Sequence, residues 1–148
     1  MTVICDSREK KNAHILKYFE NHNVPYIIQK MDVADYQMEN VDGLVIDRKQ
    51  NLDELARNLM NRNDHARFWK EVRRAKQNNI KMIVLCEHGG QIKKISDVSL
   101  WRSKYSGISG RAVMDEIYRV HIAYGVEFLF CDKRSTARKI LELLNYAI

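Results

Sequence analysis

Short apolar runs and amphipathic stretches alternate along the chain, and this alternation predicts strands interleaved with helices. Runs rich in Val, Ile, Leu and aromatic residues predict extended segments at 3–5, 24–28, 35–41, 43–49, 81–87 and 126–131. The run at 81–87, KMIVLCE, is almost wholly apolar, as expected of a central strand covered on both faces. The pattern favours an α/β domain with a mixed central β-sheet flanked by α-helices.

Helices are predicted where a capping residue precedes apolar positions at helical spacing. The expected caps are Asn12, Asn51, Asp64, Ser109 or Gly110, and Ser135. Gly125 is expected at the C′ position of the helix that begins near 110, because glycine adopts the left-handed conformation readily. Between 88 and 110 the pattern loosens, which predicts a glycine-containing loop.

Composition and charge narrow the class of protein. The 148 residues are 45% hydrophobic and 30% charged, which suits one globular domain over 1–148. A formal net charge of +6 and a pI near 9.3 favour nucleic acid or another anionic partner. No apolar run reaches membrane-spanning length, and the first residues do not resemble a signal peptide. Cys5, Cys86 and Cys131 lack zinc-type spacing and are expected in the core, which suits a reducing compartment.

An acidic stretch at 32–54 stands out from this basic chain, with seven acidic and two basic residues. Along a strand at 43–49, side chains alternate, so Asp47 and Lys49 are expected on one face and Arg48 on the other. Asp35 is expected on an antiparallel neighbour that returns through a turn at 42–43. Two carboxylates and an ammonium group then converge, which suits metal-assisted phosphodiester hydrolysis. The alternative is a surface strand on which Asp47 and Lys49 merely pair.

Several motifs resemble those of the XPF-type structure-specific endonucleases, over nearly the whole chain. They are Asp6-Ser7-Arg8-Glu9 after an apolar strand, Asp35-Tyr36, Ile46-Asp47-Arg48-Lys49 followed by Asp53, Arg67-Phe68, and Val84-Leu85-Cys86-Glu87. Two positions differ: Asp47 stands where the family usually has Glu, and Ala34 where it has Gly. The resemblance implies a restriction-endonuclease-like fold and metal-dependent cleavage of branched or flap DNA.

The resemblance also assigns roles to residues. It implies a set of metal ligands that binds magnesium or manganese, namely Asp6, Asp35 and Asp47, with Lys49 as electrostatic partner. Arg48 is expected to make a local structural contact or a phosphate contact. Asp53 either takes part in the active site or serves the first turn of a helix, where acidic residues are favoured. The five histidines lack paired ligand spacing, and none is assigned a catalytic role.

Basic residues supply the expected DNA contacts. The predicted helix at 65–77 carries cations that suit a phosphate track, although a basic face is also common on solvated helices. The expected DNA-binding residues are Arg8, Arg67, Lys70, Arg73, Arg74, Lys76 and Arg111. Trp101 and Tyr105 either stack on DNA strand ends or pack beneath their loop, and packing is favoured.

The partners and the place in the cell follow from the same resemblance. In this family the C-terminal portion of the nuclease domain takes part in dimerisation, so a homodimer through 110–148 is expected. The tandem helix-hairpin-helix domain common in the family is not expected here, so branch recognition falls to the nuclease domain, a dimer or another protein. The protein is expected in the cytoplasm of a prokaryotic or viral host and in the nucleus of a eukaryote.

Two other functions stay open. One is an inactive DNA-binding or dimer-partner module of the same fold, although such members have typically lost the acidic motif residues that this chain retains. The other is a resolvase or restriction enzyme on the same fold, which differs in substrate and not in chemistry.

Overall fold

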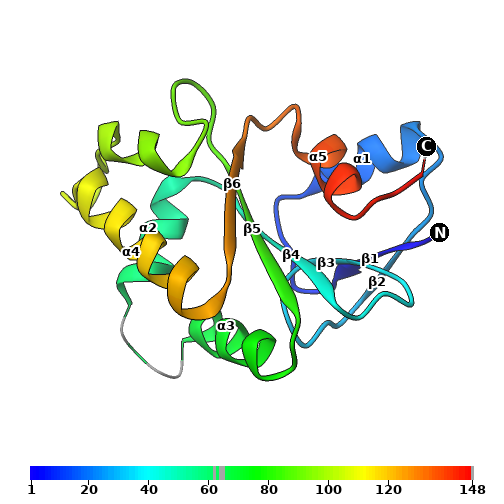
Figure 1. Cartoon of the computed structure of the whole chain (residues 1–148). Helices are drawn as coiled ribbons and strands as arrows, with labels where there is room; N and C mark the ends of the chain where they lie inside the picture. Colours follow the sequence, from blue (N-terminus) through cyan, green and yellow to red (C-terminus); the bar gives the residue numbers. More distant parts are fainter. Residues whose placement is uncertain (62, 64–65, 148) are drawn as a thin grey trace.

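A computed structural model describes residues 1–61, 63 and 66–147. Its centre is a six-stranded sheet in the order β2-β1-β3-β4-β5-β6 (Figure 1). The strands are β1 (Val3–Asp6), β2 (Tyr26–Gln29), β3 (Tyr36–Met38), β4 (Leu44–Lys49), β5 (Lys81–Glu87) and β6 (Glu127–Cys131). Neighbouring strands are parallel except at β1–β3 and β3–β4, which are antiparallel. The predicted mixed central sheet is therefore confirmed.

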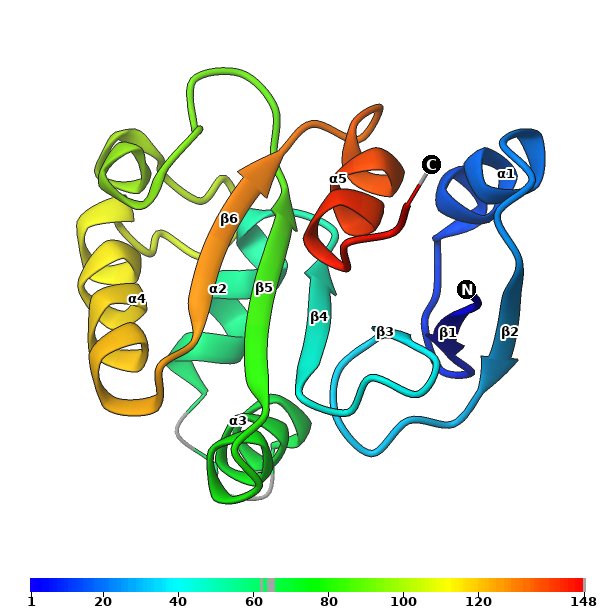
Figure 2. The ribbon, with the colours of Figure 1, turned by 45° about the vertical axis from the view of Figure 1, so that its right-hand side comes forward.

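Helices cover both faces of the sheet (Figure 2). On one face, α2 (Leu52–Met60), α3 (Arg67–Gln77) and α4 (Gly110–Tyr124) build the larger apolar core with β4, β5 and β6. On the other face, α1 (Ala13–Asn21) and α5 (Thr136–Leu143) build a second core. β5 lies between the two cores and is buried from its second residue to its last, as its continuous apolar sequence predicts.

The helix ends agree with the sequence at some positions and differ at others. Asn51 and Ser109 cap α2 and α4 by accepting backbone N–H bonds, and Gly125 ends α4 in the left-handed conformation with φ 69°. Asn12 precedes α1 but donates its side-chain amide to the Tyr36 hydroxyl instead of capping the helix. Ser135 precedes α5 and binds Asp132 instead. The expected cap Asp64 lies outside the described residues.

The segment between β5 and α4 is more ordered than the loose pattern suggested, since it contains the 3-10 helix η1 (Ile95–Leu100). Trp101 packs against the larger core, as expected, whereas Tyr105 is 86% exposed, so packing is wrong for Tyr105. Cys5 and Cys86 are buried and Cys131 is half-buried beside the second core. Among the described residues, no helix has the length and apolar character needed to cross a membrane.

Candidate active site

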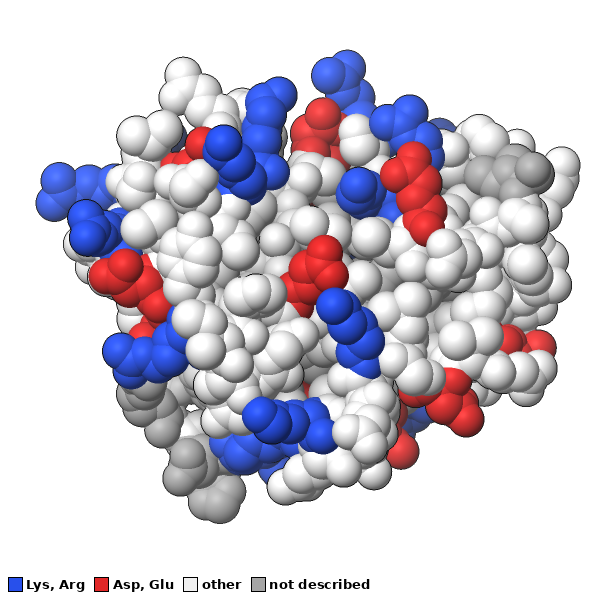
Figure 3. Space-filling model, in the orientation of Figure 1, with Lys and Arg blue, Asp and Glu red and all other residues white. Residues whose placement is uncertain are grey.

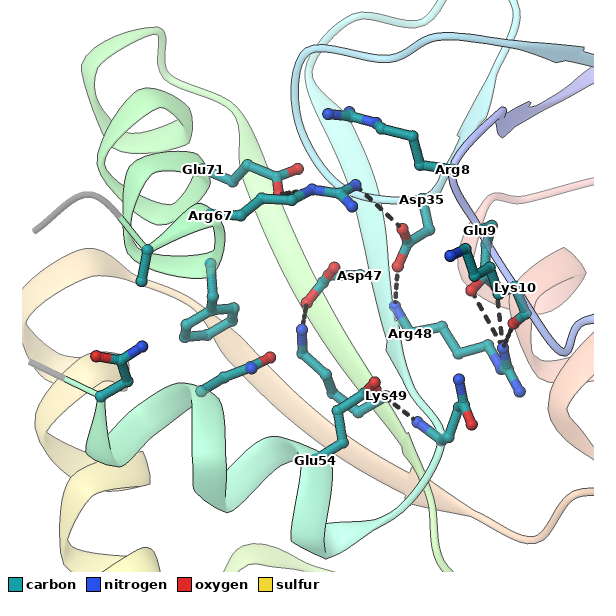
Figure 4. Close-up of a pocket in the computed structure, with 15 residues that line it drawn as sticks. Arg8, Glu9, Lys10, Asp35, Asp47, Arg48, Lys49, Glu54, Arg67 and Glu71 are labelled. Carbon is teal, nitrogen blue, oxygen red and sulfur yellow. Dashed lines mark hydrogen bonds and ion pairs between the residues drawn. The ribbon is translucent and has the colours of Figure 1, made fainter. Parts of the chain in front are cut away.

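A cavity of about 520 Å³ opens on the face of the sheet that carries the larger core (Figure 4). Its walls come from β4, from one side of α2, from the start of α3 and from the segment at 8–10 that follows β1. Asp35, Asp47 and Lys49 all line it, so the predicted alternation along β4 and the antiparallel return from β3 bring these three side chains together. We call this the first cavity.

Asp35 lies just before β3 and is fixed by backbone contacts. Its N–H donates to the Ile46 carbonyl at 2.9 Å, and its Oδ2 accepts the Arg48 N–H at 2.8 Å. Burial raises the pKa of Asp35 well above its ordinary value, and the neighbouring carboxyl group of Asp47 raises it further by charge and by hydrogen bonding. Two buried acids that face one another favour a cation between them.

Lys49 supplies part of that charge. Its Nζ lies 2.9 Å from Asp47 Oδ2 and 4.7 Å from the centre of the Phe68 ring, and its side chain is 9% exposed. Burial alone would lower the pKa of Lys49, but the charges of Asp47 and Asp35 outweigh it and raise that pKa. The ammonium is therefore held charged beneath the two acids. The Asp47–Lys49 pair of the alternative interpretation does form, but it is buried and does not lie on a surface strand.

Asp47 faces both a cation and a second carboxyl group. Its Oδ2 is buried and lies 2.9 Å from the Lys49 ammonium, and its carboxyl group faces that of Asp35. Two buried carboxylates side by side suit a divalent cation with oxygen ligands. The residues present thus fit the metal that the sequence predicts.

Asp6 is placed differently from expectation. Its Oδ1 accepts the Met31 N–H at 2.8 Å, and its Oδ2 lies 3.1 Å from both Arg8 Nε and Arg67 Nη2. Burial alone would raise the pKa of Asp6, but the hydrogen bonds and the two guanidinium charges lower it. Among the described residues, Asp6 does not line the first cavity, and no three metal-ligating side chains gather. The expected set of Asp6, Asp35 and Asp47 is therefore not assembled, and Asp6 anchors two arginines instead.

Arg48 points to the opposite side of the sheet from Asp47, as the alternation predicts. Its guanidinium donates to Glu87, to Glu9 at 3.1 Å, and to the carbonyl oxygens of Lys10 and Lys11. The residue is 4% exposed. Of the two expected roles, the structure realises the structural one, because Arg48 joins β4 to the segment after β1 and to the end of β5.

Asp53 lies on the side of α2 that faces away from the first cavity. It accepts a 2.6 Å hydrogen bond from the Ser103 hydroxyl, whose oxygen in turn accepts the N–H groups of Tyr105 and Ser106. Among the described residues, Asp53 is not a cavity-lining side chain. Its position suits holding the loop at 103–106.

Two acids near the site received no role in the sequence analysis. Glu9 lies in the Asp6-Ser7-Arg8-Glu9 motif, and Glu71 lies in the predicted helix at 65–77. Glu71 accepts the Ala34 N–H at 2.6 Å and pairs with Arg67 Nε at 2.9 Å. Glu9 accepts the Tyr36 hydroxyl at 2.6 Å and pairs with Arg48. Burial raises the pKa of both acids. The available signal for Glu71 was its helical spacing, since it falls between the inward positions of α3 and four residues after Arg67.

The expected DNA-binding cations do not form one uniform track along α3. Arg67 turns toward Asp6, Glu71 and Asp35, and Lys76 donates to the Ala123 carbonyl and lies over the Tyr124 ring. Arg111 pairs with Asp115 on α4. The face seen in Figure 3 carries lysines and arginines dispersed among acids. The basic residues therefore have different neighbours, and only some of them face a cavity.

Comparisons with solved structures find the same fold in XPF from Aeropyrum pernix, alone and in complex with DNA. The TM-score is 0.73 for both, at 18% and 19% sequence identity. The matches cover 98% and 97% of this chain but only 64% and 63% of those chains, so this chain spans less than two thirds of their length. No curated protein matches the sequence. The model of the ERCC4 domain matches residues 5–144, and the chain therefore belongs to the ERCC4 domain family.

Proposed function

We propose that this chain is a divalent-metal-dependent endonuclease domain that hydrolyses phosphodiester bonds in branched or flap DNA. One observation carries the proposal: Asp35 and Asp47 lie buried side by side above the charged Lys49, and all three line the first cavity. Similarity to a structure of XPF in complex with DNA and the net charge of +6 support DNA as the substrate.

Each residue has a separate task in this proposal. Asp35 and Asp47 would hold Mg²⁺ or Mn²⁺, which when bound polarises a phosphoryl oxygen and supplies a hydroxide-like nucleophile. Lys49 stabilises the negative charge that develops on the phosphoryl oxygens, and its burial between Asp47 and Phe68 keeps it aligned for this. Arg8 and Arg67 stand at the edge of the first cavity and attract the DNA backbone.

The test is single-turnover cleavage of labelled flap, fork, Holliday and linear DNAs with magnesium, manganese or EDTA. Asp47→Asn keeps the shape but removes the charge that a hard cation requires, so cleavage should collapse. Asp47→Glu restores the family's usual residue but moves the carboxylate by about one carbon–carbon bond, and a misplacement of this size costs about a hundredfold. Asp35→Ala should abolish cutting and leave DNA binding intact or stronger.

The matched control is Asp42→Asn, the same chemical change at an exposed position just before β4. It should cut at the wild-type rate. Undiminished cleavage in EDTA, or a folded Asp47→Asn protein that cuts like wild type, would contradict the proposal. Binding to these DNAs without cleavage of any of them would instead favour the inactive module.

A further inference from the structure

A second cavity, of about 310 Å³, adjoins the first one (we call it the second cavity). It lies between α3 and the segment at 30–32 that leads from β2 toward β3. Five cationic side chains line it, against two acidic ones. The cations are Arg8, Lys30, Arg67, Lys70 and Arg74.

Two acids, Asp32 and Glu71, cannot neutralise five cations. Glu71 is already engaged by the Ala34 N–H and by Arg67. Arg74 donates to the backbone carbonyl of Asp32 at 2.7 Å, a contact that fixes the guanidinium and leaves its charge in place. Lys30 and Lys70 are exposed, and within the described part of the chain no hydrogen bond or ion pair engages either side chain. The second cavity therefore has an excess of positive charge and two ammonium groups ready to bind.

Arg8 and Arg67 line both cavities. Their guanidinium groups are tied to the same Asp6 oxygen, each at 3.1 Å. In Figure 4 they lie on one side of Asp35, and Lys49 lies on the other. A chain of anionic groups that runs from the first cavity toward the two arginines would next reach Lys30 and Lys70. A nucleic-acid strand is such a chain, since it carries a phosphate at every nucleotide.

We propose that the second cavity is a phosphate-binding subsite. It holds a backbone phosphate of the same DNA strand whose phosphodiester bond is cleaved in the first cavity. The proposal rests on the proposed function, because it takes DNA as the ligand. Lys30 and Lys70 supply charge-assisted hydrogen bonds to the phosphate oxygens, and Arg74 adds a fixed positive charge. Such a contact sets the register of the strand and carries no base specificity. The same chemistry would accept free inorganic phosphate, which the experiment separates.

The experiment measures DNA binding in EDTA by fluorescence anisotropy, so it does not require cleavage. Lys30→Ala and Lys70→Ala should each weaken binding about tenfold at low salt, as expected for one charge-assisted hydrogen bond. Each should also reduce the slope of log K against log salt by about 0.7–0.9, which is the value for one phosphate contact. Lys17→Ala is the matched control, because Lys17 is exposed on α1, across the sheet from both cavities, and should leave both quantities unchanged.

The location of the contact is tested with DNAs that carry one neutral methylphosphonate at successive positions. One position should weaken binding to the wild-type protein, and Lys70→Ala should abolish the effect of that position alone. If the loss of affinity from Lys70→Ala added to that from the methylphosphonate at every position, no single phosphate would contact Lys70, and the proposal would be overturned. Inorganic phosphate at millimolar concentration should compete with native DNA for the wild type but not for Lys70→Ala. Phosphate binding without any effect of either lysine on DNA affinity would mean a free-phosphate site and would overturn it.

These readouts are separate from the chemistry. If the phosphate position is found but no DNA is cut under any metal condition, the proposed function fails and the subsite stands. If cleavage depends on Asp47 but neither lysine affects binding, the subsite fails and the proposed function stands.

Discussion

The substitution Asp35→Asn tests the proposed metal site through stability, independently of cleavage. In the absence of metal, burial raises the pKa of Asp35, and repulsion between the ionised carboxyl groups of Asp35 and Asp47 raises it further. A group with a raised acidic pKa favours folding below its ordinary value of 3.8 and loses that contribution as pH rises through the higher folded value. Asparagine removes the charge, and its side-chain oxygen can still accept the Arg48 N–H, now 2.8 Å from Oδ2.

In EDTA at neutral pH we therefore expect Asp35→Asn to have a higher Tm than wild type. The free energy of unfolding should rise by about 0.5–2 kcal/mol, the usual gain from a single stabilising substitution. Saturating magnesium should reverse the order. A ligand at 100 times its Kd stabilises the protein that binds it by about 2.7 kcal/mol. For a domain of this size, 1 kcal/mol shifts Tm by roughly 2–4 °C, so wild type should gain roughly 5–10 °C.

The assay is thermal unfolding by calorimetry over a magnesium titration, with Asp42→Asn as the matched exposed control. The Tm of Asp42→Asn should rise with magnesium concentration as the wild-type Tm does, and the Tm of Asp35→Asn should not change with magnesium. Equal stabilisation of wild type and Asp35→Asn by magnesium would remove Asp35 from the proposed metal site. A lower Tm for Asp35→Asn in EDTA would show that the two carboxyl groups do not repel as the structure implies.

Three further changes test the surroundings of the site. Arg48→Ala should lower the free energy of unfolding in urea by about 3–5 kcal/mol, because it removes the guanidinium that pairs with the buried Glu9 and Glu87 and leaves them only the Tyr36 hydroxyl and His14; a cost below about 1 kcal/mol would contradict this network. Asp53→Ala should speed amide hydrogen exchange in the loop at 103–106 and leave the single-turnover cleavage rate within about twofold of wild type. Loss of cleavage by a folded Asp53→Ala protein would show that Asp53 takes part in the active site. Homodimerisation remains a prediction, now centred on α4, where Ile122 is 81% exposed. Sedimentation equilibrium at tens of micromolar should show a dimer that Ile122→Glu dissociates. A 17.5 kDa species alone would count against the dimer.

The sequence was sufficient for features that depend on local periodicity. The alternation along β4 predicted that the Asp47 and Lys49 side chains share one face of the sheet and that the Arg48 guanidinium turns to the other, toward Glu87, because the side-chain period of a strand is fixed. The turn at 42–43 brought β3 antiparallel to β4, which placed Asp35 in the same cavity. The continuous apolar run of β5 predicted its burial from both sides. Each of these inferences needed only residues that lie near one another in the sequence.

The partners of charged groups could not be predicted in the same way. Asp6 ends β1 as expected, but its role depends on Arg8, Met31 and Arg67, which reach it from three separate segments. A sequence motif shows that a carboxylate is present. It does not show whether an arginine or lysine from another segment forms an ion pair with that carboxylate. Tyr105 illustrates the same limit for aromatic residues, since burial beneath a loop depends on the path of the loop and not on the residue type.

Ala34 connects the two cavities through the backbone. It is fully buried with φ 64°, in the left-handed region that costs a non-glycine residue about 1–2 kcal/mol and that the glycine of the resembled family adopts without strain. This conformation directs the Ala34 N–H to Glu71 at 2.6 Å, and a buried hydrogen bond to a charged group contributes about 1.5–3 kcal/mol, enough to offset the strain. The same Glu71 binds Arg67, which lines both cavities. One carboxylate on α3 therefore sets both the turn that presents Asp35 to the proposed metal and the arginine that stands beside the proposed phosphate subsite.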